Sequence, residues 1–288
     1  MSMSATIDTD SNVAALASGK GAADENFPVG SFVLRPAVRP AVMAFYRFAR
    51  AADDVADNEQ ASPAEKLRLL AAMRVTLEGS SEADAPALAL RCALHGAGVT
   101  LDHAQDLLTA FERDVTERRT ASWDALIDYC RVSAMPVGRF MLDVHGESPD
   151  LWPLSDALCA ALQIINHLQD CAEDRRTLDR VYLPDDLLAQ HGASVADLDA
   201  PRASPALRAV IVDLAERSGV LLDESAGFSA TIRDWRLGVE VAVITALARD
   251  LIHLLLVRDP LSEHVHHRKS TAIRIALMAA ARQLVLGR

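Results

Sequence analysis

Residues 42–58 read VMAFYRFARAADDVADN, and they carry the first of two polar stripes that decide the fold of this chain. An α-helix brings residues three, four and seven positions apart onto one face. In such a helix Tyr46, Arg50, Asp53 and Asp57 form a single stripe, while the flanking positions are largely apolar or small. A solvated face normally mixes Lys, Glu and Gln, so this stripe is predicted to face an interior cavity.

A second stripe of the same kind occurs in residues 162–176, which read LQIINHLQDCAEDRR. Gln163, Asn166, Asp170 and Asp174 follow one another at spacings of three, four and four, and Glu173 stands three positions after Asp170. The surrounding residues are again mostly Leu and Ile. Two apolar helices are therefore predicted, each presenting acidic side chains one turn apart.

Paired aspartates on two helices indicate a site for divalent cations. Carboxylates one turn apart can share a hard cation such as Mg²⁺, which prefers oxygen ligands and usually retains water and substrate phosphates. Two such pairs facing one cavity would hold several Mg²⁺ ions around a diphosphate, with Tyr46 and Arg50 donating hydrogen bonds to phosphate oxygens. The competing interpretation, a solvated helix face, explains either stripe alone better than it explains both.

The composition favours helices along the whole chain. Hydrophobic residues make up 50% and aromatic residues 5% of the 288 residues, and no segment alternates with period two. We predict an all-α fold with a single domain at residues 24–288, preceded by a disordered tail at residues 1–23. The predicted helices cover residues 36–58, 62–78, 85–97, 102–118, 122–145, 154–177, 184–190, 204–227, 234–258 and 270–286.

Charge and hydropathy restrict the partners of the protein. The net charge of −11 argues against a nucleic-acid partner, because phosphate backbones require clustered Lys and Arg. We expect a cytoplasmic protein, since the sequence shows neither a secretory leader nor an uncharged apolar run of the ~18 residues that span a bilayer. Its C-terminal end is locally basic beside an apolar helix, which suggests peripheral contact with the inner face of the membrane. These basic residues are Arg268, Lys269, Arg274, Arg282 and Arg288.

The two stripes and a third segment together resemble the squalene/phytoene synthase family of head-to-head prenyl synthases. The first stripe matches the family pattern YxxxRxxDDxxD, which adds Asp54 to the stripe. The second matches QxxNxxxDxxED, followed by a DRxYLP segment that begins at Asp179 and contains Arg180 and Tyr182. The third segment is Tyr129 followed by SAMPVG at residues 133–138.

The resemblance implies a role for each matched residue. Asp53, Asp57, Asp170 and Asp174 would bind Mg²⁺ together with Asn166, and Tyr129 would join these aspartates as a catalytic residue. The SAMPVG segment would make room for a prenyl chain. The remaining implied contacts to the isoprenoid diphosphate substrate come from Ser31, Tyr46, Arg50, Asp54, Gln163, Asn166, Glu173, Arg180 and Tyr182.

Three short stretches are similar to one bacterial branch of the family, the hydroxysqualene synthases of hopanoid synthesis. These are ENFPVGS at 25–31, YRFARAADDVAD at 46–57 and MPVGR at 135–139. The similarity implies loss of diphosphate from presqualene diphosphate and capture of the carbocation by water, giving hydroxysqualene. It also implies functional coupling to a presqualene diphosphate synthase and to a flavin-dependent, squalene-forming reductase. Gln169 stands where carotenoid-forming members often have Arg, which fits a substrate with one diphosphate.

Two alternatives remain open at this point. Condensation of two prenyl diphosphates to presqualene diphosphate, squalene or phytoene would use the same metal-binding residues, so the acidic motifs do not exclude it. A non-catalytic assembly factor of the same fold would be expected to lose metal ligands, whereas all four outer aspartates are present.

Overall fold

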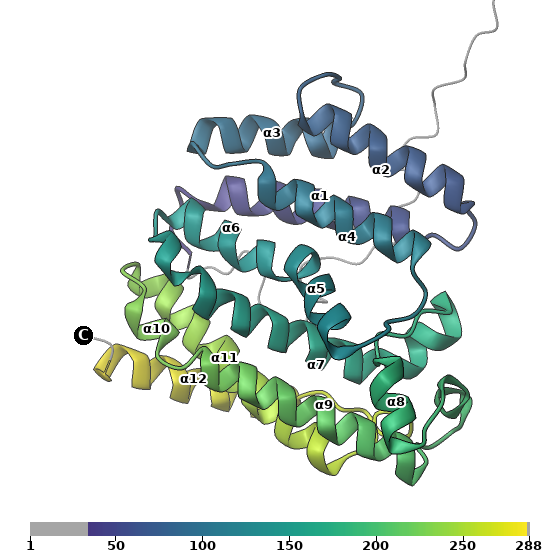
Figure 1. Cartoon of the computed structure of the whole chain (residues 1–288). Coiled ribbons are helices and arrows are strands. Elements are labelled where there is room, and N and C mark those ends of the chain that lie inside the picture. Colours follow the sequence, from purple (N-terminus) through teal and green to yellow (C-terminus); the bar gives the residue numbers. More distant parts are fainter. Residues whose placement is uncertain (1–33, 287–288) are drawn as a thin grey trace, which may run out of the picture.

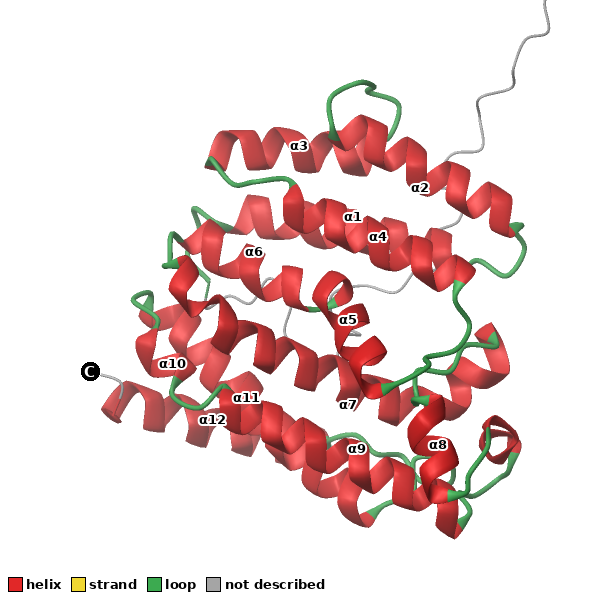
Figure 2. Cartoon of the chain, viewed as in Figure 1, coloured by secondary structure: helices red, strands yellow, loops and turns green. Residues whose placement is uncertain are grey.

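A computed structural model describes residues 34–286, so the predicted tail at residues 1–23 and the candidate residue Ser31 lie outside the described residues. Within residues 34–286 every regular element is a helix (Figure 2). The single β feature in this range is an isolated parallel bridge between Arg119 and Val181. The predicted all-α class is confirmed, while the bounds of the predicted domain stay a prediction.

The helices follow one another with short connections. The α-helices of the described residues are α1 (Arg39–Asp57), α2 (Pro63–Leu77), α3 (Ala85–Ala97), α4 (Asp102–Thr116), α5 (Trp123–Ser133), α6 (Met135–His145), α7 (Trp152–Leu178), α8 (Asp185–His191), α9 (Pro205–Glu224), α10 (Phe228–Thr231), α11 (Trp235–Val257) and α12 (Lys269–Leu286). Two 3₁₀ helices, η2 (Pro149–Leu151) and η3 (Val195–Asp199), lie between them.

Local sequence explains where the helices begin and end. Ser62 accepts a hydrogen bond from the backbone N–H of Glu65, and Pro63 occupies the first turn of α2, where its missing N–H costs nothing. Gly98 ends α3 and Gly146 ends α6, both in the left-handed conformation that glycine adopts most readily. Such caps are legible in the sequence, which is why the predicted helix ends lie close to the observed ones.

The predicted helix at residues 122–145 is two helices, α5 and α6, which meet at Ala134. Pro136 sits in the first turn of α6, where it cannot donate the backbone hydrogen bond that would continue α5. A Cβ on Gly138 would lie 2.3 Å from Ser155 Oγ and 2.6 Å from Cys159 Sγ, so glycine lets α6 approach α7 closely. Gly138 therefore serves helix packing, and the predicted role of this segment in making room for a prenyl chain stays a prediction.

The described residues form two hydrophobic cores, and the helices that carry them lie one group above the other in Figure 1. One joins α1–α4 and is completed by Phe140 of α6, while the other joins α5–α9 and α11. Met141 of α6 packs against both cores. The first acidic stripe lies on α1 of the upper core and the second on α7 of the lower core, so the site forms where the two cores meet.

Candidate active site

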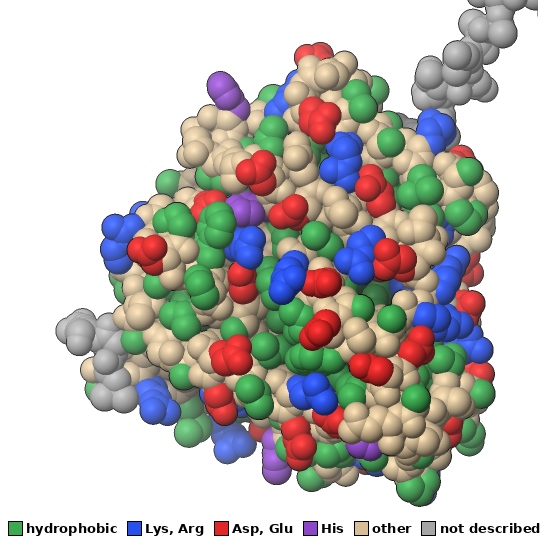
Figure 3. All heavy atoms as spheres, in the orientation of Figure 1, with side chains coloured by type: hydrophobic (Ala, Val, Ile, Leu, Met, Phe, Trp, Pro, Cys, Tyr) green, Lys and Arg blue, Asp and Glu red, His purple; other side chains and the backbone are tan. Residues whose placement is uncertain are grey.

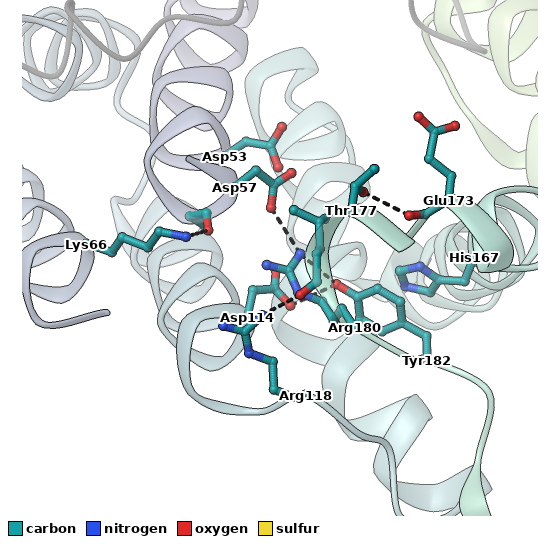
Figure 4. Close-up of polar contacts among 12 residues, drawn as sticks. Asp53, Asp57, Lys66, Asp114, Arg118, His167, Glu173, Thr177, Arg180 and Tyr182 are labelled. Atoms are coloured by element: carbon teal, nitrogen blue, oxygen red, sulfur yellow. Dashed lines mark hydrogen bonds and ion pairs between the residues drawn. The ribbon is translucent and has the colours of Figure 1, made fainter. Parts of the chain in front are cut away.

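Arg180 links the two halves of the site, and it is supplied by the segment that leaves α7. Asp179 ends α7 at φ 51°, the one positive φ outside glycine in the described residues, and this turn directs Arg180 back toward α1. Arg180 Nη1 donates to Asp57 Oδ1 at 3.1 Å and to the Tyr182 hydroxyl at 3.3 Å (Figure 4). The Arg180 side chain is buried, whereas 39% of the Asp57 side chain is exposed, so this ion pair joins a buried guanidinium to a carboxylate that remains accessible.

The pKa of Asp174 on α7 responds to charges on α1 and α4. Burial raises the pKa of Asp174 to about 7, and repulsion by Asp170, Asp57 and Asp114 adds to this effect against the attraction of Arg180. Asp57 belongs to α1 and Asp174 to α7. The aspartates of the two predicted stripes thus act on one another across the site.

The α1 stripe contains a positively charged side chain, Arg50. Arg50 Nη1 lies 2.9 Å from Asp53 Oδ2, and Arg50 Nε lies 3.5 Å from Asp54 Oδ1. Burial raises the pKa of Asp53 to about 7, with a further contribution from Asp57, and Arg50 only partly offsets the rise. One third of the Asp53 side chain is still exposed, so the carboxyl group stands at the mouth of the site, open to a ligand.

An apolar cavity of about 260 Å³ begins beside this stripe. Tyr46, Arg50 and Asp53 line its polar side, and the other lining residues include Phe45, Phe111, Val137, Phe140 and Met141. The rings of Phe45 and Phe140 stack with 3.9 Å between their centroids. A cavity that is acidic at one side and apolar elsewhere suits a ligand with a charged head and a hydrocarbon tail.

A larger cavity of about 890 Å³ contains none of the predicted site residues. Its lining combines Arg35, His145, Asp234 and Trp235, and Arg35 Nε pairs with Asp234 Oδ2 at 2.7 Å. Neither acidic stripe reaches this cavity, so its size alone does not mark it as the active site.

Asp114 of α4 is a central residue that the sequence prediction missed. Its carboxylate accepts hydrogen bonds from the Tyr129 and Tyr182 hydroxyls, each at 2.9 Å. Burial raises the pKa of Asp114 to about 6, although Arg180 and the two tyrosines favour its charged form. A signal was available, because Asp114 lies seven positions after Leu107 on the buried face of α4, where an acid is unusual.

His167 of α7 was missed as well. It stands four positions after Gln163 and three before Asp170, which places it on the face of the second stripe. Its ring stacks on Tyr182 with 3.6 Å between centroids, and its Nε2 lies 3.1 Å from Gln163 Nε2. Burial, reinforced by Arg180, lowers the pKa of His167 to about 3, so the ring is neutral and Nε2 accepts from the amide.

Of the predicted site residues on α7, Glu173 lies apart from the Arg180 group. Glu173 is exposed and its side chain points away from the Arg180 group in Figure 4. Gln169 is buried and donates to the backbone carbonyl of Val265, so it faces the chain that follows α11. The replacement of Arg by Gln at this position therefore gives no information on the number of substrate diphosphates. Asn166 and Asp170 are half-buried on α7, within the stripe.

The carboxylates of the two stripes suit a hard cation such as Mg²⁺ that takes further ligands from the substrate. Among residues 34–286 no three His, Cys, Asp or Glu side chains stand close enough to form a complete metal site. Mg²⁺ does not require such a cage, because it commonly binds one or two carboxylates and takes its other ligands from phosphates and water. Burial raises the pKa of Asp53 and of Asp174 to about 7, and neighbouring carboxylates raise it further, so a bound cation would stabilise the charged form of both groups.

The sequence model of one family, described as squalene/phytoene synthase, matches residues 21–271. The chain belongs to the squalene/phytoene synthase family. Members of this family generally depend on a divalent metal, in agreement with the oxygen-rich donor set. The identification as a member of this family, predicted from the motifs, is confirmed.

Individual relatives cover nearly the whole chain. It is 54% identical to a hydroxysqualene synthase of Zymomonas mobilis over 95% of this chain and 93% of that one. A presqualene diphosphate synthase of the same organism is 32% identical over 69% of each chain. The crystal structure of a squalene synthase from Alicyclobacillus acidocaldarius superposes with a TM-score of 0.71 at 30% identity, covering 84% of this chain and 90% of that one. The protein is an enzyme with the helical isoprenoid-synthase fold.

Proposed function

We propose that this enzyme is a hydroxysqualene synthase, which converts presqualene diphosphate and water into hydroxysqualene and diphosphate. The observation that carries the proposal is the contrast between the two Zymomonas mobilis relatives, since the hydroxysqualene synthase is far more similar to this chain than the presqualene diphosphate synthase. The difference in identity and coverage therefore favours the hydroxysqualene synthase reaction over the condensation reaction.

Asp53 and Asp57 on α1, with Asp170, Asp174 and Asn166 on α7, would hold Mg²⁺. The bound ion would supply positive charge to the departing diphosphate. The chain itself would orient that group: Arg50 and Arg180 stand beside the two stripes as guanidinium donors, which suit phosphate oxygens. Tyr46 and Gln163 lie on the same two stripes and would add neutral hydrogen bonds.

The apolar cavity beside Asp53 would hold the prenyl chains and keep water from the carbocation until the rearrangement is complete. Tyr129 and Tyr182 donate to Asp114, and burial raises the pKa of both hydroxyls. Both tyrosines therefore stay protonated and fix the Asp114 carboxylate. Asp114 in turn attracts Arg180, so this inner layer positions the arginine that faces Asp57.

A product assay tests the reaction. Purified protein is incubated with Mg²⁺ and either presqualene diphosphate or farnesyl diphosphate, and the products are identified by mass spectrometry. We expect hydroxysqualene from presqualene diphosphate and no turnover of farnesyl diphosphate. Accumulation of presqualene diphosphate from farnesyl diphosphate, without hydroxysqualene from the first substrate, would assign the protein to the condensation step.

Metal binding has a test that does not depend on turnover. The melting temperature is measured with Mg²⁺ and inorganic diphosphate, separately and together, for the wild type and for Asp57→Asn. At a ligand concentration of 100 times its Kd, binding stabilises the native state by about 2.7 kcal/mol. We expect the largest rise for the wild type with both ligands and a smaller one for the variant. Equal rises in melting temperature for the two proteins would show that Asp57 does not bind the metal.

We further propose that the enzyme acts in the cytoplasm, in peripheral contact with the inner face of the membrane. None of the helices within residues 34–286 is long and apolar enough to cross a bilayer. A presqualene diphosphate synthase would supply the substrate and a flavin-dependent reductase would take the product to squalene. Both the substrate and the product carry long hydrocarbon chains, which favours exchange at a lipid surface.

A further inference from the structure

The C-terminal helix α12 has one covered side and one uncovered side. It packs along α11 at one edge of the molecule, far from α2 and α3 (Figure 1). Gln283 fixes its rotation, because Gln283 Nε2 donates to the Ser229 carbonyl at 2.9 Å and the Ser229 hydroxyl donates to Gln283 Oε1 at 3.0 Å. The side opposite Gln283 therefore faces outward.

That outward side is apolar. Its large side chains are between 48% and 76% exposed, and we call them together the α12 face: Ile273, Leu277, Met278, Leu284 and Val285. Successive members stand four, one, six and one residues apart, and at 3.6 residues per turn all five fall within less than half of the helix circumference. Single exposed apolar residues are common on proteins, whereas five large ones on the same side of one helix, with alanines between them, form a patch that indicates a binding surface.

The α12 face is also basic. Residues 268–288 read RKSTAIRIALMAAARQLVLGR, with five basic residues and no acid, in a chain whose net charge is −11. Arg274 and Arg282 are exposed on or beside the face. Elsewhere the charges are mixed, since acidic and basic side chains are interspersed over the face of the molecule seen in Figure 3.

An interfacial aromatic residue lies near the end of this helix. Gly238 of α11 lies against Gln283, where an added Cβ would be 3.4 Å from Gln283 Nε2. Trp235 stands one turn before Gly238, toward the end of α12, and it is 58% exposed. Tryptophan is favoured at the boundary between lipid tails and headgroups.

We propose that the α12 face is a docking surface for an anionic lipid bilayer, with the apolar side chains among the acyl chains and the arginines at the headgroups. The proposal rests on the proposed membrane contact and is independent of the proposed reaction. A second copy of the chain fits this surface less well. A twofold interface centred on this face would bring the arginines of one copy close to those of the other, so equal charges would repel in an apolar contact.

A vesicle assay tests the proposal without substrate or metal. The purified full chain is mixed with vesicles of phosphatidylcholine alone, or of phosphatidylcholine with phosphatidylglycerol, and separated by flotation at low and high salt. We expect binding to the anionic vesicles that weakens as salt rises, because screening reduces the attraction of the basic side chains. Binding to neutral vesicles is expected to be much weaker.

Two variants separate the apolar from the charged contribution. Leu277→Glu places an acid in the centre of the α12 face and should abolish flotation. Its control is Val75→Glu, which changes an exposed apolar residue on α2 at the far end of the molecule and should float like the wild type. Arg274→Gln with Arg282→Gln should lower the partition coefficient for anionic vesicles about 30-fold, whereas exposed Arg202→Gln should leave it unchanged.

Three results would overturn the proposal. The first is no flotation of the wild type with anionic vesicles, and the second is equal binding of Leu277→Glu and wild type. The third is a concentration-dependent dimer in sedimentation velocity that Leu277→Glu abolishes, which would assign the face to self-association. Circular dichroism of each variant checks that the fold is retained. Because turnover is not measured, failure here leaves the proposed reaction to its own assay.

Discussion

The protein buries acidic groups in two different ways. Asp53, Asp114 and Asp174 share a network of carboxylates, guanidinium groups and phenols between α1, α4 and α7. Glu240 on α11 is buried alone, and desolvation by itself raises its pKa to about 7. Both regions hold protons near neutral pH, yet the causes differ, since like charges add to the shift only in the network.

The difference shows why a shifted pKa does not identify an active site by itself. Glu240 Oε2 has no hydrogen-bond partner in the structure, so its raised pKa reports an apolar location and nothing more. In the network the same shift comes with Arg180 at 3.1 Å from Asp57 and with two tyrosines on Asp114. Such a network can exchange protons for a cation, whereas Glu240 has no neighbouring acid with which to share one.

The largest expected effect is a loss of activity when the carboxylate network is changed but not when Glu240 is changed. Asp174→Asn removes a proposed cation ligand while keeping the shape of the side chain, and we expect kcat/KM for hydroxysqualene formation to fall about 10³-fold. Glu240→Gln is the matched control, a buried acid exchanged for its amide, and its activity should stay within about twofold of wild type. Equal losses in the two variants would contradict a special role for the network.

The second prediction concerns Glu240 and pH. Its folded-state pKa of about 7 lies above its ordinary value of 4.5, so the contribution of Glu240 to stability is fully present below pH 4.5. Between pH 4.5 and 7 the unfolded chain releases this proton while the folded chain keeps it, so stability falls across that window, by about 3 kcal/mol. Glu240→Gln has no such loss.

Denaturant unfolding of wild type and Glu240→Gln at pH 4.5 and pH 8 measures this difference. The variant should gain about 3 kcal/mol on the wild type between the two pH values, because all other titrating groups are common to both proteins. A constant difference across the range would show that Glu240 titrates normally in the folded state.

The smallest expected effect tests the inner layer of the network. Tyr129→Phe removes one of the two hydroxyl donors to Asp114 and keeps the ring, so the free energy of unfolding should fall by about 2 kcal/mol. Tyr182→Phe removes the second donor, and its hydroxyl also accepts from Arg180. Urea unfolding at pH 8 measures both variants. A larger loss for Tyr129→Phe than for Tyr182→Phe would contradict this account.

The sequence predicted the two stripes because helical periodicity alone determines which side chains share a face. The sequence could not decide whether Glu173 faces the site or solvent, because a position at the edge of a stripe is compatible with both. Asp114 was missed because its helix shows one acid on an apolar face rather than a repeated pattern. The turn at Asp179 could not be predicted either, because its left-handed conformation depends on contacts made with distant residues.

The turn at Asp179 lowers the conformational cost of binding the substrate. Arg119 Nη2 holds the Asp179 carboxylate at 2.8 Å, and Arg175 pairs with the same oxygen, so the turn is fixed from both sides. The residue that follows it is Arg180, whose guanidinium is already directed at Asp57. The enzyme is thus preorganised: the conformational entropy of placing this arginine is lost during folding, and little of it remains to be lost when the substrate binds.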